Sequence, residues 1–322
     1  MTKKTAMVLS LLLIFGCVFS GCAASDGDDG GMSVVTTNFA LYDFARAVCG
    51  EDAEVTMLIS PGSESHDFEA TLADVAKIAS ADLFVSVGSE DWADDIFTAI
   101  GEEGVAVSRI TAMEHCEVYG SECELPGHDH NHSDHDHNHP AHDHEGEEVD
   151  EHVWTSIGNT LILLEAIAEE MVRIDPENRD DYLSRMQAYA DELKELDRQY
   201  REMISQAKRK TIVVADRFPF LYMADEYGLE WHAAFSGCSS DTEPALSVIN
   251  DLIEEVRAEE IPAVFIIELS DGRTAGAVAY ETGCEILTLQ SAQNVTKEEF
   301  RDGVTYTDLL RDNLEALRTA LN

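Results

Sequence analysis

Basic residues are scarce in this chain of 322 residues, which carries 21 Lys and Arg against 64 Asp and Glu. The formal net charge at pH 7 is −43. Nucleic acids and anionic lipid surfaces hold proteins through clusters of Lys and Arg, so the composition argues against both as partners bound through basic patches. The excess of carboxylates instead favours solubility and attracts cations to the protein surface.

Several motifs that would indicate catalysis or redox chemistry are also missing. The chain has no CxxC pair, which disfavours a zinc finger or a dithiol redox site. It has neither the HExxH pattern of zinc proteases nor the GxSxG pattern of serine hydrolases. A catalytic zinc with an open position could still form, but no general base is indicated beside it. We therefore expect that the protein is not an enzyme.

Long apolar runs are absent apart from one at residues 6–19, which follows two lysines and is too short for a confident membrane span. It leads into small residues and Cys22, which resembles the lipobox of bacterial lipoproteins. Residues 1–22 are therefore predicted to be a lipoprotein signal peptide, with Cys22 lipidated. The alternatives are lipidation at Cys17 or a cleaved export signal without lipid. In each case the protein works outside the cytoplasm.

The segment after Cys22 is short and polar. Residues 23–32 are rich in Asp, Gly and Ser, which is typical of a flexible tether. Five cysteines follow it, and an odd number leaves at least one thiol unpaired unless an intermolecular bond forms. Cys116 and Cys123 could pair or bind metal. Cys49 and Cys284 are interpreted as small buried apolar residues.

Histidine is concentrated in one stretch. Eight of the 12 histidines fall between residues 128 and 144, mostly alternating with Asp or Asn. The stretch has too few apolar side chains to build a core. Imidazole is the commonest metal ligand and nearby carboxylates favour a divalent cation, so we predict loose binding of Zn²⁺ or a similar ion by loop 127–149. The ligands would be His128, His130, His132, His135, His137, His139, His142 and His144. The alternatives are a solvated charged loop and a purification tag, and the internal position disfavours the tag.

Short β-rich runs alternate with helical patterns on both sides of this loop. Residues 33–155 are predicted to form an N-terminal α/β lobe that includes the loop, with its fourth strand at residues 105–107. Residues 156–209 form a helical region with one long helix, and the alternation resumes over residues 210–322. The fold class predicted is α/β, with two parallel-sheet lobes joined by a long rigid helix.

Two of the four histidines outside the loop suit a metal site. His66 lies between a predicted strand and a helix, and ligand sites of open α/β sheets gather at the carboxyl ends of strands. The alternative is a surface histidine. His152 precedes a helix, and acidic neighbours could orient its second ring nitrogen. His115 borders the loop and His232 opens an apolar strand, so both are less favoured.

These segments resemble the zinc- and manganese-binding lipoproteins of ABC importers, and the resemblance covers nearly the whole mature chain. The motifs that carry it are Val34-Val35-Thr36-Thr37 followed by Phe39, Gly62-x-x-x-His66-x-Phe68-Glu69-x-Thr71, Glu151-His152-Val153-Trp154, Tyr227-Gly228-Leu229 and Thr242-Glu243-Pro244. The His-rich insertion is similar to that of the zinc-specific branch. The resemblance implies a metal cleft between the two lobes, with His66 and His152 as the first two ligands.

Two further ligand positions depart from that family. Arg217 stands where the family has His or Glu, and an arginine cannot be a ligand because it stays protonated. Gln290 aligns with the usual Asp and offers only a neutral carbonyl oxygen. We expect Glu268 or Gln290, with or without water, to complete the pair of histidines. Asp216 or Glu268 could instead pair with Arg217. The alternative is a degraded cleft, so that only the loop binds metal.

The function that the resemblance implies is metal capture. The protein would be a lipid-anchored monomer on the extracytoplasmic face of the cell membrane, with Zn²⁺ as its bound substrate. It would deliver the ion to an ABC permease and its ATPase, which are separate chains. Mn²⁺ is the second candidate, although it favours oxygen-rich, six-coordinate sites. A metal-sequestering or adhesin lipoprotein without transport is a further alternative.

Overall fold

The computed structural model describes residues 31–64, 68–120, 149–236 and 244–322. Several predictions lie outside the described residues: the lipidated Cys22, the ligand His66, the eight histidines of the loop, and Cys123 as a partner for Cys116. Within the described ranges, no helix is long and apolar enough to cross a membrane.

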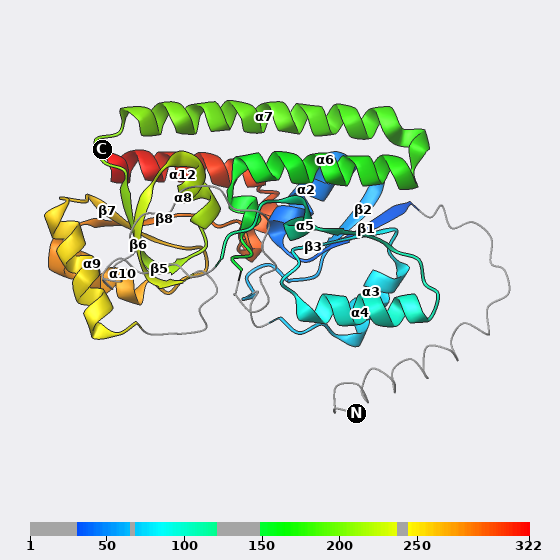
Figure 1. Cartoon of the computed structure of the whole chain (residues 1–322), viewed down its shortest axis with the longest axis horizontal. Helices are drawn as coiled ribbons and strands as arrows, with labels where there is room; N and C mark the ends of the chain where they lie inside the picture. The colour runs from blue at the N-terminus through cyan, green and yellow to red at the C-terminus, as the bar shows by residue number, and fades with distance from the viewer. Residues whose placement is uncertain (1–30, 65–67, 121–148, 237–243) are drawn as a thin grey trace, which may run out of the picture.

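The N-terminal lobe is built on a parallel sheet with strand order β2-β1-β3-β4. Successive residues of a strand point to opposite faces, and both faces are covered here, so Val34 and Val35 are both buried. Helices α2 and α6 lie on one side, and α3 and α4 on the other (Figure 1). The elements are β1 (Met32–Thr36), α2 (Phe39–Cys49), β2 (Ala53–Met57), α3 (Leu72–Ser80), β3 (Leu83–Ser86), α4 (Asp91–Glu102), β4 (Ser108–Thr111) and the short α5 (Ala112–His115).

The fourth strand corrects the sequence prediction, because it begins at Ser108 and not at residue 105. The backbone N–H of Val105 donates to the carbonyl of Ile100, so this residue closes the end of α4 and is not available to the sheet. The strand pairs with β3 from Ser108 onward, and Ile110 is its buried residue. Val105 and Val107 are partly buried against the core, but they lie in a loop and not in a strand.

The C-terminal lobe repeats the layout, with a parallel sheet in the order β6-β5-β7-β8. Alternate residues of β5 again serve two cores: Val213 faces α9 and α10, while Val214 belongs to the core that continues under α12. The elements are β5 (Thr211–Phe218), α8 (Leu221–Tyr227), β6 (Glu230–Ser236), α9 (Leu246–Ala258), β7 (Ala263–Ile266), α10 (Arg273–Thr282), β8 (Glu285–Thr288), α11 (Lys297–Asp302) and α12 (Tyr306–Leu321).

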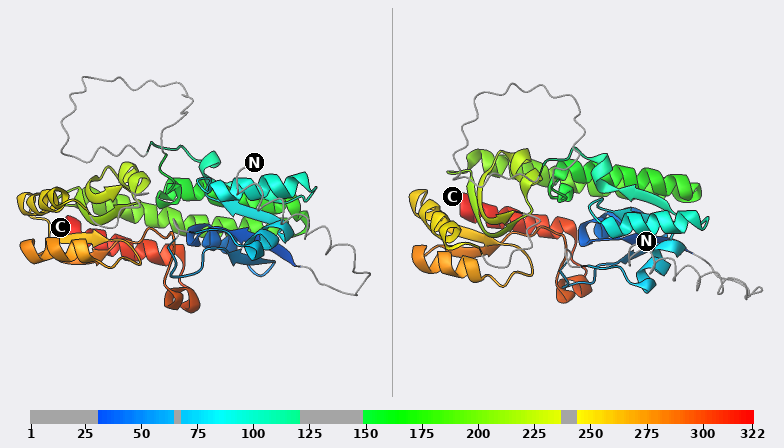
Figure 2. Two further views of the ribbon diagram at one scale, coloured as in Figure 1. Left: turned by 90° about the horizontal axis from the view of Figure 1, so that it is seen from below. Right: turned by 60° about the horizontal axis from the view of Figure 1, so that its bottom comes forward.

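One long helix spans the junction of the lobes, which lie end to end (Figures 1 and 2). After η1 (Val153–Thr155), α6 (Ile157–Ile174) and η2 (Pro176–Asn178), helix α7 (Arg179–Gln206) runs along both lobes. It packs against α2 and α6 in one and against α8 and α12 in the other. Its 28 residues make it about 42 Å long at 1.5 Å per residue.

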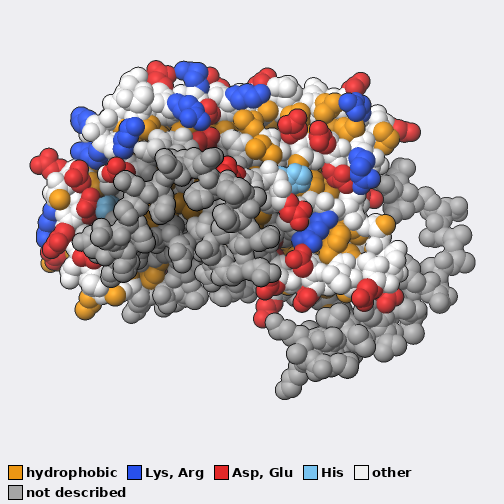
Figure 3. Space-filling view, viewed as in Figure 1, with side chains coloured by type: hydrophobic (Ala, Val, Ile, Leu, Met, Phe, Trp, Pro, Cys, Tyr) orange, Lys and Arg blue, Asp and Glu red, His pale blue; other side chains and the backbone are white. Residues whose placement is uncertain are grey.

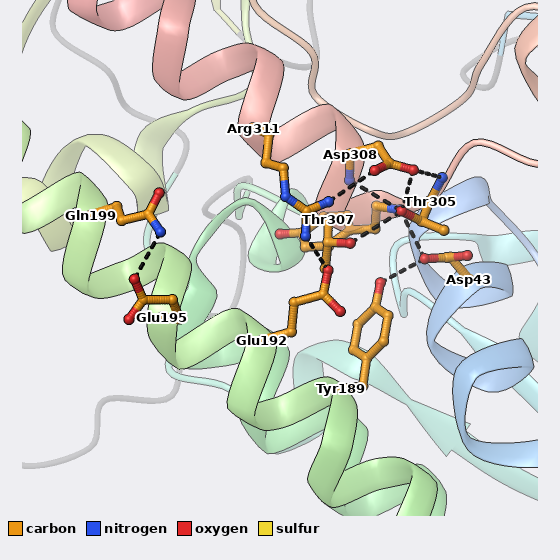
Figure 4. A network of polar contacts seen from close by, with 10 residues as sticks. Asp43, Tyr189, Glu192, Glu195, Gln199, Thr305, Thr307, Asp308 and Arg311 are labelled. Carbon is orange, nitrogen blue, oxygen red and sulfur yellow. Dashed lines mark hydrogen bonds and ion pairs between the residues drawn. The ribbon is translucent and has the colours of Figure 1, made fainter.

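A polar network joins these helices where the lobes meet (Figure 4). The carboxylate of Asp43, on α2, is 1% exposed and accepts a hydrogen bond from the hydroxyl of Tyr189 on α7 (2.6 Å). It also accepts one from the backbone N–H of Tyr306, at the start of α12 (2.8 Å), and pairs with Arg46. One side chain of the N-terminal lobe therefore holds α7 and the start of α12 at the junction.

Candidate metal centre

His152 is the described residue around which the candidate centre is built. Its side chain is fully buried, and ring nitrogen Nδ1 lies 3.1 Å from the carboxylate oxygen Oδ1 of Asp150. The same oxygen accepts the backbone N–H of His152 at 2.9 Å. An acidic neighbour thus contacts the ring, as expected from the sequence. A carboxylate at Nδ1 leaves Nε2 as the nitrogen suited to a metal.

The segment that carries His152 is held from both lobes. The backbone N–H of Asp150 donates to the carbonyl of Tyr119 (2.9 Å), and the hydroxyl of Tyr222 on α8 donates to the carbonyl of Asp150 (2.6 Å). Gly120 and Val149 form an isolated antiparallel bridge. Gly120 and Val149, the described residues on either side of positions 121–148, therefore lie side by side, directly before Asp150.

Burial and charge act on His152 in opposite directions. Burial lowers the pKa of the imidazole, while the hydrogen bond and the charge of Asp150 raise it, together with the charges of Glu151 and Glu268. The net result is a pKa above the ordinary value for histidine. A divalent cation must displace the proton from this ring, and the same three carboxylates that favour the proton also favour the cation.

Glu268 follows strand β7 and faces the segment after β8. One carboxylate oxygen accepts the backbone N–H of Ser291 at 2.7 Å, and the other accepts the Ser291 hydroxyl and the backbone N–H of Gln293, the latter at 3.2 Å. Burial raises the pKa of Glu268, and these hydrogen bonds oppose the shift only in part. The charge of Glu268, the predicted oxygen ligand, therefore acts on His152. Both of its carboxylate oxygens are also hydrogen-bonded to residues 291–293.

Gln290, the other predicted oxygen ligand, is fixed through its backbone. Its N–H donates to the side chain of Asn313 on α12 (2.7 Å), and the Asn313 amide donates to its carbonyl (2.8 Å). Within the described part of the chain, its side-chain oxygen Oε1 is buried without a hydrogen-bond partner. An acceptor in that state suits a donor or a cation that is not part of the protein.

Gln293 is a residue that the sequence reasoning missed. Its side-chain Nε2 donates to Glu151, next to His152, at 3.4 Å. Both side chains line a cavity of about 180 Å³, which Asn38 and Glu90 also line. The irregular segment after β8 has no periodicity, so the sequence could not show which of its two glutamines contacts the residue beside His152.

Arg217 does not pair with either carboxylate considered from the sequence. Its guanidinium lies 3.4 Å from Glu64, on the opposite lobe, and this is the ion pair it makes among the described residues. Asp216 accepts the backbone N–H of Arg217 itself (2.9 Å) and the hydroxyl of Ser270. The register of β5 shifts between Val214 and Arg217, a bulge-like irregularity that turns the side chain toward the other lobe.

The chain that leads to His66 is anchored at the same junction. The side-chain amide of Asn294 donates to the carbonyls of Ser60 (3.0 Å) and Ser63 (2.7 Å), and the N–H of Gly62 donates to the carbonyl of Val295 (2.8 Å). His66 itself lies outside the described residues. Over the ranges that are described, no group of three or more His, Cys, Asp and Glu lies close enough to hold a metal by itself.

The remaining histidines and cysteines lie elsewhere. His232, on β6, pairs with Glu255 at 3.3 Å within the C-terminal lobe, and His115 ends α5. Cys49 is buried, as expected, whereas Cys284 is only partly buried. These positions agree with the lower preference given to both histidines. On the face drawn in Figure 3, acidic side chains are widely spread, and Lys and Arg lie mainly along the edge formed by α7.

The chain is similar to several proteins of known function. AdcA of Streptococcus pyogenes, a zinc-binding protein, is 32% identical over 320 residues, which is 99% of this chain and 61% of the relative. The chain thus spans about three-fifths of that protein. ZnuA of Bacillus subtilis, a high-affinity zinc uptake system protein, is 31% identical over 316 residues, covering 96% of this chain and 94% of the relative.

Solved structures agree with these relatives. The Zn(II)-bound ZnuA-like domain of Streptococcus pneumoniae AdcA superposes with a TM-score of 0.72 at 29% identity, covering 91% of this chain and 99% of that domain. The laminin-binding adhesin Lmb of Streptococcus agalactiae, in a mutant form, gives 0.75 at 26% identity, covering 91% of this chain and all of that one. The family model for the periplasmic zinc-uptake complex component A, ZnuA, matches residues 34–320. The resemblance inferred from the motifs is confirmed, and the chain belongs to the ZnuA family of metal-binding components.

Proposed function

We propose that this protein captures a divalent transition metal outside the cytoplasm, with Zn²⁺ as the preferred substrate, and delivers it to an ABC permease and its ATPase. The observation that carries the proposal is His152, a fully buried imidazole oriented by Asp150 at the junction of the lobes. Asp150 contacts the ring, and the charges of Asp150, Glu151 and Glu268 act on it, so the site is suited to a positive charge, whether a proton or a metal cation. Relatives named as zinc-binding and zinc-uptake proteins support the same reading.

The ligands that we propose are His66 and His152, completed by an oxygen of Glu268 or Gln290. Two imidazoles with an oxygen donor suit zinc better than manganese. The described chain before His66 is anchored to residues 294 and 295, next to the turn that contacts the His152 segment. Arg217 adds no ligand, so fewer protein groups would hold the ion than in relatives with a third histidine, and its release would be easier.

Loop 127–149 is proposed to collect ions for the cleft. The support is geometric, since Gly120 and Val149, which flank the loop residues, form a bridge next to Asp150. Ions held loosely by the loop would be concentrated beside the deeper site. Anchoring by a lipid on Cys22 would keep the protein near its permease, and relatives from Streptococcus pneumoniae are named zinc-binding lipoproteins.

The test is a competitive zinc titration of the mature chain with and without residues 127–146, with Mn²⁺ as a competitor. We expect one tight site to remain after the deletion and to disappear in His66→Ala and in His152→Ala. His232→Ala, which removes a histidine of the C-terminal lobe, is the matched control. Loss of all tight binding on deleting the loop would contradict a metal site in the cleft. Tighter binding of Mn²⁺ than of Zn²⁺ would contradict zinc as the preferred substrate and favour manganese.

A further inference from the structure

The carboxylate of Glu268 is hydrogen-bonded to the short turn Ser291–Gln293 through both of its oxygens. Three donors converge on its two oxygens, namely the backbone N–H groups of Ser291 and Gln293 and the hydroxyl of Ser291. Hydrogen bonds to a charged acceptor are the stronger kind, and two backbone donors fix the path of the chain as well as a side chain. The carboxylate therefore holds residues 291–293 in one conformation.

The held turn reaches the histidine segment through two contacts. The carbonyl of Ser291 accepts the indole N–H of Trp154 at 2.8 Å, and the side chain of Gln293 donates to Glu151 at 3.4 Å. The Trp154 ring is fully buried and packs edge-on against the ring of His152, with centroids 5.4 Å apart. Glu151, directly before His152, and Trp154, whose ring contacts the His152 ring, are thus both hydrogen-bonded to the turn.

The backbone on both sides of this interaction is unusual. Leu269 follows Glu268 with φ at 61°, and Ala292 lies within the turn with φ at 58°. Residues with a Cβ atom rarely adopt this left-handed region, and they keep it only where surrounding contacts impose it. The Leu269 side chain is 43% exposed, so its own burial does not impose the conformation. Around Ala292, the backbone N–H groups of Ser291 and Gln293 on either side are both bonded to Glu268, which fixes this stretch of backbone.

We propose that Glu268 is a positioning residue for the metal site. Its carboxylate fixes the Ser291–Gln293 turn, and the turn fixes Trp154 and Glu151, so the His152 ring is preorganised before the ion arrives. This inference rests on the proposed function for its effect on metal affinity. It adds to that function a reason for a carboxylate at this position, whether or not one of its oxygens also reaches the ion.

The experiment compares Glu268→Gln, Ser291→Ala and the double variant in the full mature chain. Glutamine keeps the size of the side chain but presents an amide donor to the Ser291 and Gln293 donors. Two measurements are made: hydrogen exchange of the Ser291 and Gln293 backbone amides in the metal-free protein, and Zn²⁺ affinity by competition. Ser270→Ala is the matched control, because it removes another serine-to-carboxylate hydrogen bond at the same sheet edge without touching the turn.

We expect Glu268→Gln to accelerate exchange of both amides at least about tenfold and to weaken zinc binding by roughly 10- to 100-fold, the usual effect of losing an outer partner of a metal site. Ser291→Ala should change both quantities in the same direction but less, and the double variant should be no worse than Glu268→Gln. The Ser270→Ala control should stay within about twofold of the parent protein.

Two outcomes would separate the possible failures. If Glu268→Gln loses zinc affinity while Ser291→Ala changes neither exchange nor affinity, Glu268 acts as a direct ligand and the positioning role is refuted. If the parent protein itself binds no zinc tightly, the proposed function fails, and the exchange data on the metal-free protein still decide whether Glu268 holds the turn. Should Glu268→Gln not fold, Ser291→Ala alone decides through the same two measurements.

Discussion

Asp150→Asn is the substitution that tests most directly how the site is organised. The carboxylate is 2% exposed and contacts His152 twice, at ring nitrogen Nδ1 and at the backbone N–H. Asparagine keeps the shape and one acceptor oxygen but removes the negative charge. The substitution therefore changes the basicity of the imidazole while disturbing the packing around it as little as the chemistry allows.

The expected loss of zinc affinity at pH 8 is about 10- to 100-fold, since outer partners of metal-binding histidines contribute that much. This corresponds to about 1.4–2.7 kcal/mol of binding free energy. Asp150 also raises the pKa of His152, so the parent protein loses affinity as the pH falls through that raised value. In the variant the proton competes less. The difference between the two proteins should therefore be smaller at pH 6 than at pH 8.

The stability of the metal-free protein independently checks the direction of the pKa shift that Asp150 causes in His152. A histidine whose folded pKa is raised adds stability that is fully present below its unfolded value of about 6.5 and is lost as the pH rises through the folded value. The parent chain should lose this contribution on going to higher pH, and Asp150→Asn should lose less. Urea unfolding at several pH values measures both.

Asp225→Asn is the control for this experiment, because Asp225 bonds Tyr119 near the same segment without contacting His152. Zinc affinity is measured by chelator competition between pH 6 and pH 8. An equal loss of affinity for Asp150→Asn at both pH values would refute the assigned control of the imidazole by Asp150. A comparable loss in Asp225→Asn would show that the effect is general loosening of the segment.

Two further predictions concern the junction of the lobes. Asp43→Asn should lower the free energy of unfolding by about 2 kcal/mol, because buried donors of Tyr189 and Tyr306 lose a charged acceptor; urea unfolding measures this, and an unchanged midpoint would contradict it. Arg217→Gln should change stability by less than about 1 kcal/mol, as for other partly exposed ion pairs. Arg217→Gln should also make the rate of zinc release less sensitive to salt, because the ion pair with Glu64 is lost, and Glu64→Gln should have the same effect. Stopped-flow chelation at several salt concentrations measures this rate, and unequal salt dependence in the two variants would refute a functional ion pair.

Much of the fold follows from local sequence signals. Parallel strands covered on both faces are continuously apolar, which is why β1 and β3 could be located from short runs of buried residues. The start of α3 is also a local signal, since Thr71 and Asp74, three residues apart, form a capping box. The strand at residues 105–107 was misplaced because its valines pack against a core without joining the sheet. An apolar side chain indicates that a residue is buried, but it does not show which group its backbone N–H and carbonyl bond.

The candidate site divides in the same way. His152 and its acidic neighbour were found together because they are adjacent in the chain, and Glu268 was found because strand ends share one edge of a parallel sheet. Gln293 and the pairing of Arg217 with Glu64 could not be found. Each depends on how one lobe is placed against the other, and no local pattern encodes that placement.

The sequence by itself determined the class of protein, the α/β alternation, the acidic surface and the histidines suited to a metal. These properties reside in residue types and in their spacing along one strand or helix. Only the tertiary structure decided that Asp43 ties three helices, that Arg217 bonds the opposite lobe, and that Glu268 holds the turn beside His152. Such contacts join residues far apart in the chain, and the core packed under α7 and α12 sets the distances between them.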